Sequence, residues 1–168
     1  MTLDQLNEIS AELATAELLK CCGSTRWARE MSRNRPFASL EELCQKADAV
    51  CGSLNEEDWL EAFRAHPKIG ERKAATDQSQ QAQTWSAHEQ SGLTNAARAT
   101  VNKLAQQNRD YEARFGFIFI VCATGKSPED MLAILRSRIG NDRQDEVLIA
   151  AEEQRKITRL RLEKLLSQ

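Results

Sequence analysis

The sequence predicts an all-α protein, a single-domain bundle of about seven to nine helices that takes up residues 1–168. Apolar residues recur at steps of three and four along most of the chain, which is the spacing of one helix face. Serine, threonine and asparagine residues stand in front of these stretches, as helix N-caps do. Only one stretch has the composition of a β-strand, and a lone strand would have no partner.

Helices are expected from the first residues onward. Thr2 and Gln5 have the spacing of a capping box, and four apolar residues at helical spacing predict the first helix: Leu3, Leu6, Ile9 and Leu13. Residues 24–34 and 39–50 repeat the pattern with a serine in front of each stretch. The N-terminal part of the chain is therefore expected to be a series of short helices.

The middle of the chain combines a helix end with a long polar stretch. A helix starts at Asn55 and must end near His66, because Pro67 disfavours helical backbone in the residue before it. Residues 71–84 are rich in glutamine and lack large apolar side chains, so a long loop or frayed helix is expected there. Another helix follows over about residues 93–111.

The C-terminal part predicts two helices and one irregular segment. Residues 117–121 have strand-like composition without a second strand to pair with, so helix or locally extended chain is expected there. Ser127 and Pro128 are a strong helix start, and that helix should run to Ile139. Residues 143–166 lack glycine and proline and form the longest expected helix.

Composition excludes several classes of function. The chain has 23 basic and 25 acidic side chains, a net charge of -2, and they alternate in sign, which disfavours nucleic-acid binding. The longest apolar run, residues 115–123, is too short to span a membrane, and the first residues do not resemble a secretion signal. The five cysteines fit neither paired disulfides nor a zinc-ligand spacing. We expect a cytoplasmic protein with reduced thiols.

His66 is a candidate proton-transfer residue. Pro67 fixes it at the carboxyl end of a helix, where the helix dipole favours imidazolium. The pKa of His66 should then be raised, unless burial opposes it, and a raised pKa suits a general acid near neutral pH. A structural role as a C-terminal cap is the alternative, and the dipeptide alone leaves both open.

Ser86, Glu89 and Gln90 lie within one helical turn after the polar stretch, so they could contact one ligand. The alternative is a capping box made by Ser86 and Glu89. A zinc-protease motif is excluded because Gly92, not histidine, stands four residues after His88, and the chain has only two histidines. We expect no catalytic metal.

Two further candidates have equally plain alternatives. If residues 119–123 are not regular helix, their backbone amides and carbonyls are available to bind a polar ring, although their side chains favour a core position. Arg161 could contact an anionic or carbonyl group of a ligand. It could also belong to a solvated basic face of the last helix, together with Arg155, Lys156, Arg159 and Lys164.

Taken together, seven short motifs in order along the chain resemble one family, the OHCU decarboxylases of the ureide pathway of urate breakdown. These motifs are Arg35-Pro36-Phe37, Ala65-His66-Pro67-Lys68-Ile69-Gly70, Ser86-Ala87-His88-Glu89-Gln90, Phe115-Gly116-Phe117, Phe119 to Ala123, Lys156-Ile157 and Arg161-Leu162. The resemblance covers nearly the whole chain. It departs from the family at Lys68-Ile69-Gly70 and at His88, where members often carry other residues.

The resemblance implies an all-helical homodimer that acts on a small-molecule ureide without metal or cofactor. The implied reaction converts 2-oxo-4-hydroxy-4-carboxy-5-ureidoimidazoline (OHCU) to (S)-allantoin and carbon dioxide. The implied catalytic residues are His66, which matches the family's catalytic histidine, and Glu89, which falls on a position that contacts the substrate. The other implied substrate contacts are Pro67, Ser86, Gln90, Phe119, Ile120, Val121, Cys122, Ala123 and Arg161.

The chemistry of this substrate explains why no cofactor is expected. Its carboxylate lies beside a ring C=N bond that accepts the electrons released with carbon dioxide. We expect His66 to transfer a proton and Glu89 to accept a hydrogen bond from the hydroxyl or ureido group. Arg161 could contact the carboxylate or a carbonyl. The rival interpretations are a binding module without catalysis, and a ureide hydrolase in which His66 and Glu89 activate water.

Overall fold

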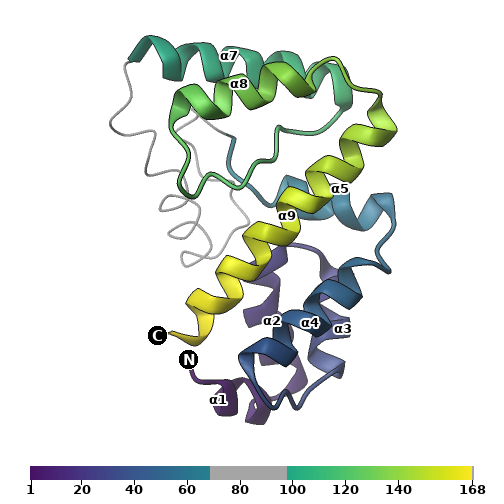
Figure 1. Ribbon diagram of the computed structural model, residues 1–168. Coiled ribbons are helices and arrows are strands. Elements are labelled where there is room, and N and C mark those ends of the chain that lie inside the picture. The colour runs from purple at the N-terminus through teal and green to yellow at the C-terminus, as the bar shows by residue number, and fades with distance from the viewer. Residues whose placement is uncertain (69–97, 168) are drawn as a thin grey trace. The chain divides into compact units, whose positions relative to one another are not determined.

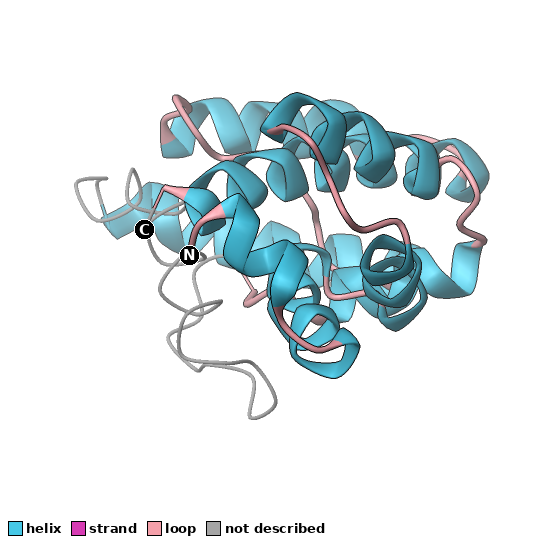
Figure 2. Cartoon of the chain, turned by 90° about the horizontal axis from the view of Figure 1, so that it is seen from below, coloured by secondary structure: helices cyan, strands magenta, loops and turns pink. Residues whose placement is uncertain are grey.

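The structure is a computed structural model, and it describes residues 1–68 and 98–167. In these residues the chain forms eight α-helices and no strand (Figure 2). The all-α prediction is therefore confirmed. No helix in the described ranges is long and apolar enough to cross a membrane.

The chain divides into two compact units. Unit 1 comprises Met1–Ala62 and Gln154–Gln168, and unit 2 comprises Phe63–Glu153. The division falls within two helices, α5 and α9, so each contributes residues to both units. The organisation of residues 1–168 as a single domain stays a prediction.

Unit 1 is built mainly from short helices (Figure 1), and most of its buried side chains are apolar. Its helices are α1 (Leu3–Glu8), α2 (Ala11–Cys22), α3 (Thr25–Arg33), α4 (Leu40–Cys51), most of α5 (Glu56–Arg64) and the last part of α9 (Arg143–Leu166). Helix α3 packs against both α2 and α4. Trp27, Leu18 and Leu43 are fully buried in the core.

The predicted first helix is in fact two helices. The backbone at Ile9 leaves helical geometry (φ -65°, ψ 160°), and the side chain of Ser10 accepts a hydrogen bond from the Leu13 amide to start α2. Leu13 therefore belongs to α2 and not to the helix of Leu6, and it is 59% exposed whereas Leu6 is fully buried. The cause is the N-cap at Ser10, which interrupts an apolar spacing that would otherwise continue.

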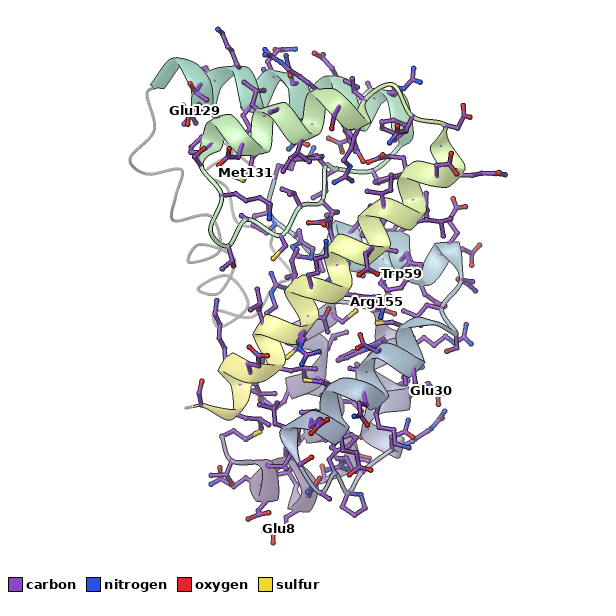
Figure 3. The ribbon with its side chains drawn as sticks, viewed as in Figure 1. Glu8, Glu30, Trp59, Glu129, Met131 and Arg155 are labelled. Carbon is purple, nitrogen blue, oxygen red and sulfur yellow. The ribbon has the colours of Figure 1, made fainter. Side chains whose placement is uncertain are left out.

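Unit 2 contains two paired helices joined by an irregular segment. Helix α7 (Arg98–Phe115) packs against α8 (Pro128–Arg138), and residues 116–127 connect them without regular structure (Figure 1). Ser127 caps α8 in a capping box with Asp130, as the sequence predicts. In the first turns of α8, Glu129 is exposed and Met131 is fully buried (Figure 3).

Candidate active site

His66 lies just beyond α5, where the sequence places it. The helix ends at Arg64, and the His66 amide donates a hydrogen bond to the Phe63 carbonyl at 3.1 Å in a final turn. Pro67 cannot continue the helical hydrogen bonding. His66 and Pro67 are both half-buried, so the imidazole is neither in the core nor fully in solvent.

Two contacts within unit 2 hold the turn around His66. On one side, the Phe63 ring lies 5.3 Å from the Phe117 ring, centroid to centroid. On the other side, the Lys68 ammonium contacts the Glu112 carboxylate at 2.7 Å. His66 is thus fixed between an aromatic contact to the irregular segment and an ion pair to α7.

The irregular segment is buried, and polar side chains hold its backbone. Residues 117–123 are each no more than 8% exposed. Four side chains bind its amides and carbonyls: Asn108 accepts from the Phe119 amide at 3.0 Å, Glu153 accepts from the Cys122 amide at 2.7 Å, Arg138 donates to the Ile120 carbonyl at 2.8 Å, and Lys126 donates to the Cys122 carbonyl at 2.7 Å. Each of these side chains supplies a hydrogen bond to one backbone group that has no partner in a helix or sheet.

Other backbone groups of the same segment have no such partner. Among the described residues, none forms a hydrogen bond with the Ile120 amide or with the amide and carbonyl of Val121. Buried backbone groups are nearly always paired, so unpaired ones indicate a site for a ligand or water. Of the two alternatives expected for residues 117–121, helix or locally extended chain, the structure has irregular chain. The role of residues 119–123 in binding a ligand stays a prediction.

A buried charged cluster supports the irregular segment. Arg138 and Glu146 form an ion pair at 2.6 Å, and the Tyr111 hydroxyl donates to Glu146. All three residues are at most 6% exposed. The Arg138 guanidinium also lies over the Phe119 ring, 4.8 Å from its centroid. Burial and the hydrogen bond to Glu146 raise the pKa of Tyr111.

The sequence alone does not indicate this cluster. Arg138 is in the last turn of α8 and Glu146 is in the first turn of α9, and these are the positions where charges commonly complement a helix dipole. The sequence signal available for this pair is that Arg138 and Glu146, which have opposite charges, lie on either side of Gly140 and Asn141. Asn141 indeed donates to Glu146 at 2.8 Å.

Arg161 is buried in unit 1, with 2% exposure. The interpretation of Arg161 as part of a solvated basic face is therefore wrong. Its Nη1 lies 3.5 Å from the Lys20 carbonyl in the last turn of α2, where carbonyls lack partners within the helix. The charge lies close to Cys21 and Cys22, and burial raises the pKa of Cys22 to about 11.

The predicted site residues thus fall into three groups. His66, Pro67 and residues 119–123 belong to unit 2, and Arg161 belongs to unit 1. Ser86, Glu89 and Gln90, together with the polar stretch 71–84, lie outside the described residues. Within the described ranges, no three His, Cys, Asp or Glu side chains come together as a metal ion requires.

One motif of the resemblance, Arg35-Pro36-Phe37, has a structural role and is not among the candidate site residues. Arg35 donates to the carbonyls of Leu6 and Ile9 at 2.7 and 2.8 Å, where α1 ends. Asn7 exchanges two hydrogen bonds with the backbone of Phe37, at 2.8 and 2.9 Å. Arg35-Pro36-Phe37 therefore ties the end of α1 to the segment before α4.

Comparison with known proteins identifies consistent relatives. The family model described as OHCU decarboxylase matches residues 7–163. A uric acid degradation bifunctional protein of Arabidopsis thaliana is 37% identical over 159 residues, which cover 95% of this chain and 49% of that protein. The chain thus spans about half the length of this relative.

Two further relatives are similar over nearly their full length. A 2-oxo-4-hydroxy-4-carboxy-5-ureidoimidazoline decarboxylase of Haloferax volcanii is 29% identical, with 96% of this chain and 94% of that protein covered. The second is a solved structure, described as the crystal structure of OHCU decarboxylase in the presence of (S)-allantoin. Its sequence is 38% identical to this chain, and the two structures match with a TM-score of 0.78. The match covers 90% of this chain and 98% of the solved chain.

Proposed function

The chain belongs to the OHCU decarboxylase family, and on that premise we propose that it is a carboxy-lyase that converts OHCU to (S)-allantoin and carbon dioxide in urate degradation. The observation that carries this proposal is the set of unpaired, buried backbone groups at Ile120 and Val121, in the same unit as His66. They lie within the range that the family model matches.

These backbone groups suit a ureide ring in particular. A ureide carries N–H and C=O groups side by side, so it needs an acceptor and a donor that are also neighbours. The amide and carbonyl of Val121 are such a pair, and the Ile120 amide adds one donor. A ligand that pairs with them removes the cost of leaving buried polar groups unsatisfied, about 1–3 kcal/mol each.

The proposed reaction needs a proton donor more than an electron acceptor. The bond between the carboxylate and the hydroxyl-bearing ring carbon breaks and carbon dioxide leaves. The electron pair forms a C=C bond to the neighbouring ring carbon, while the C=N electrons move to the ring nitrogen, which is protonated. A proton must then reach that neighbouring carbon, which carries the ureido group, from one side to give a single enantiomer, as the hydroxyl loses its proton and becomes the carbonyl. We assign this proton transfer to His66, whose position is fixed by Pro67 and by the contacts of Phe63 and Lys68.

The remaining roles are carried over from the family motifs. Glu89 would accept a hydrogen bond from the hydroxyl or ureido group, and Ser86 and Gln90 would orient the ring. Pro67 and the backbone of residues 119–123 would form further contacts, and Arg161 would bind the carboxylate or a carbonyl. The proposal includes catalysis without metal or cofactor, a homodimer, a cytoplasmic location and a single domain over residues 1–168.

The proposal is tested by the handedness and rate of product formation. Freshly generated OHCU is supplied, and the optical activity of allantoin and the release of carbon dioxide are followed together. The wild-type protein should give (S)-allantoin faster than the spontaneous reaction, which yields racemic product. Racemic allantoin at the spontaneous rate would overturn the proposal.

Two histidine variants test the assignment of the proton transfer. His66→Asn should lower kcat by about 10²–10⁴-fold, the usual effect of losing a general acid or base. The matched control is His88→Asn, a change at the chain's other histidine, which should leave the rate within about twofold of wild type. A folded His66→Asn variant with full rate would refute the assignment and leave the reaction itself intact.

The same assay separates the rival functions. A ureide hydrolase would consume its substrate without releasing carbon dioxide, and a binding module would change neither rate nor optical activity. A chelator should leave the rate unchanged, and loss of activity that added metal restores would contradict catalysis without metal.

A further inference from the structure

Arg138 makes two kinds of contact at once, one with the candidate site and one with a buried anion. Its Nη1 donates to the Ile120 carbonyl at 2.8 Å, and its guanidinium lies over the Phe119 ring. Its Nε donates to Glu146 at 2.7 Å. A planar guanidinium holds several partners in fixed directions, whereas a lysine ammonium does not.

The residues behind Arg138 leave it little freedom to move. Glu146 is fully buried and also accepts hydrogen bonds from Tyr111 and Asn141. Tyr111 in turn packs edge-on against the Phe119 ring, with centroids 5.4 Å apart. The guanidinium and the ring that it covers are therefore fixed by the same neighbours.

The backbone groups without partners lie next to the carbonyl that Arg138 holds. The Ile120 carbonyl and the Val121 amide belong to one peptide group, which is planar. A hydrogen bond that fixes the carbonyl therefore fixes the direction of the Val121 amide as well. Asn108 holds the preceding amide of Phe119 in the same way, at 3.0 Å.

We propose that Arg138, held by Glu146 and Tyr111, is a positioning residue of the candidate site: it fixes the peptide group between Ile120 and Val121 so that the Val121 amide is directed at the ureide. The role rests on the proposed function for the identity of the ligand. Arg138 itself does not contact the substrate in this scheme.

The test compares two conservative arginine changes in the chain of residues 1–168. Arg138→Lys keeps the charge but loses the planar fork. Arg143→Lys is the matched control, because the Arg143 Nε donates at 3.1 Å to the Phe115 carbonyl, which precedes the irregular segment. Both proteins are first compared with wild type by circular dichroism and thermal unfolding.

Kinetics should separate the two variants. Arg138→Lys should raise KM for OHCU and weaken (S)-allantoin binding by about tenfold each, the effect of misplacing one substrate hydrogen bond. Its kcat should change by less than about threefold, because His66 is untouched. Arg143→Lys should leave all three quantities within about twofold. An Arg138→Lys protein with unchanged KM and unchanged allantoin binding overturns the proposal.

A second readout does not depend on activity. Amide hydrogen exchange at Phe119 and Cys122 in the ligand-free protein should speed up by about tenfold or more in Arg138→Lys, with exchange in α2 unchanged. Unchanged exchange at both amides also overturns the positioning role. A wild-type protein that fails to decarboxylate OHCU refutes the proposed function instead, whatever the exchange result.

Discussion

Unit 1 and unit 2 bury different kinds of groups. The interior of unit 1 is formed mostly by apolar side chains and thiols, including the fully buried Leu18, Trp27 and Cys22, although Arg161 is buried there too. The interior of unit 2 contains the Arg138–Glu146 ion pair and a stretch of buried backbone without helix or sheet hydrogen bonds. Regular helices satisfy their own backbone, so a core like that of unit 1 is not expected to bind a polar ligand through its main chain. Unit 2 has the irregular, polar interior that such binding requires.

Removing one member of the buried cluster should have the largest effect on stability. Glu146→Gln leaves the Arg138 charge buried without its counter-ion, and we expect a loss of about 3–5 kcal/mol in the free energy of unfolding. The control is Glu30→Gln, which removes an exposed pair with Arg33 on α3 (Figure 3) and should cost less than about 1 kcal/mol. Urea unfolding measures both. Equal losses of unfolding free energy in Glu146→Gln and Glu30→Gln would contradict the difference between the two units.

A cavity in the core of unit 1 should lower the free energy of unfolding somewhat less than the loss of the buried ion pair in unit 2. Leu18 is fully buried in α2, and Leu18→Ala should lower the free energy of unfolding by about 2–4 kcal/mol through lost apolar contact and an unfilled space. The exposed Leu13→Ala on the same helix is the control and should cost less than about 1 kcal/mol. KM for OHCU in folded Leu18→Ala should match that of wild type. A changed KM would show that the apolar core also shapes the substrate site.

Alkaline pH should distinguish the units by their buried acids. In unit 1, burial raises the pKa of Cys22 from its usual 9.0 to about 11, so the folded state holds the proton more tightly than the unfolded chain. The stabilisation is complete below pH 9.0 and is lost as the pH rises through about 11, a loss of about 3 kcal/mol in the free energy of unfolding. In unit 2, burial likewise raises the pKa of Tyr111 above its usual 10.0, so this residue also stabilises the folded state less as the pH rises above that value.

The measurement is the free energy of unfolding at several values from about pH 8 to pH 11, where these groups titrate. Cys22→Ala should reduce the decline that begins near pH 9.0, to which the buried Cys21 and Cys51 also contribute, and Tyr111→Phe should reduce only the part above 10.0. Identical pH profiles for both variants and wild type would contradict a contribution of these two groups to the decline.

Helix caps should give the smallest effects, and these should be equal in the two units. Ser24 accepts from the Trp27 amide at 3.3 Å in unit 1, and Ser127 accepts from the Asp130 amide at 3.1 Å in unit 2. Ser24→Ala and Ser127→Ala should each lower the midpoint of thermal unfolding, at a cost of about 1 kcal/mol. A much larger loss in one unit would mean that its cap also supports tertiary structure.

Local signals explain why most helix boundaries could be predicted. Ser24, Ser39 and Ser127 each cap the helix that the sequence places after them, and α9 runs from Arg143 to Leu166 as expected. The break at Ser10 was missed because serine is also tolerated inside helices, and the apolar spacing continues past it. A cap within a continuous apolar pattern has no signal of its own.

The site was predictable only where a local constraint acts. Pro67 determines where α5 ends, and the absence of a second strand predicts irregular chain at residues 117–121. The burial of Arg161 could not be predicted, because the carbonyl that it approaches, that of Lys20, lies far away in the sequence and backbone groups have no residue signature. The pairing of Arg138 with Glu146 was missed for a related reason, since each charge also suits its own helix end.

Tyr111 also gives the buried cluster an optical reporter. It is the only tyrosine in the chain, so ultraviolet absorption by tyrosinate can come from no other residue. As long as its hydroxyl donates to Glu146 in the closed interior, the phenol resists ionisation. After a jump to strongly alkaline solution, the growth of that absorption band therefore gives the rate at which this cluster opens, without any added label.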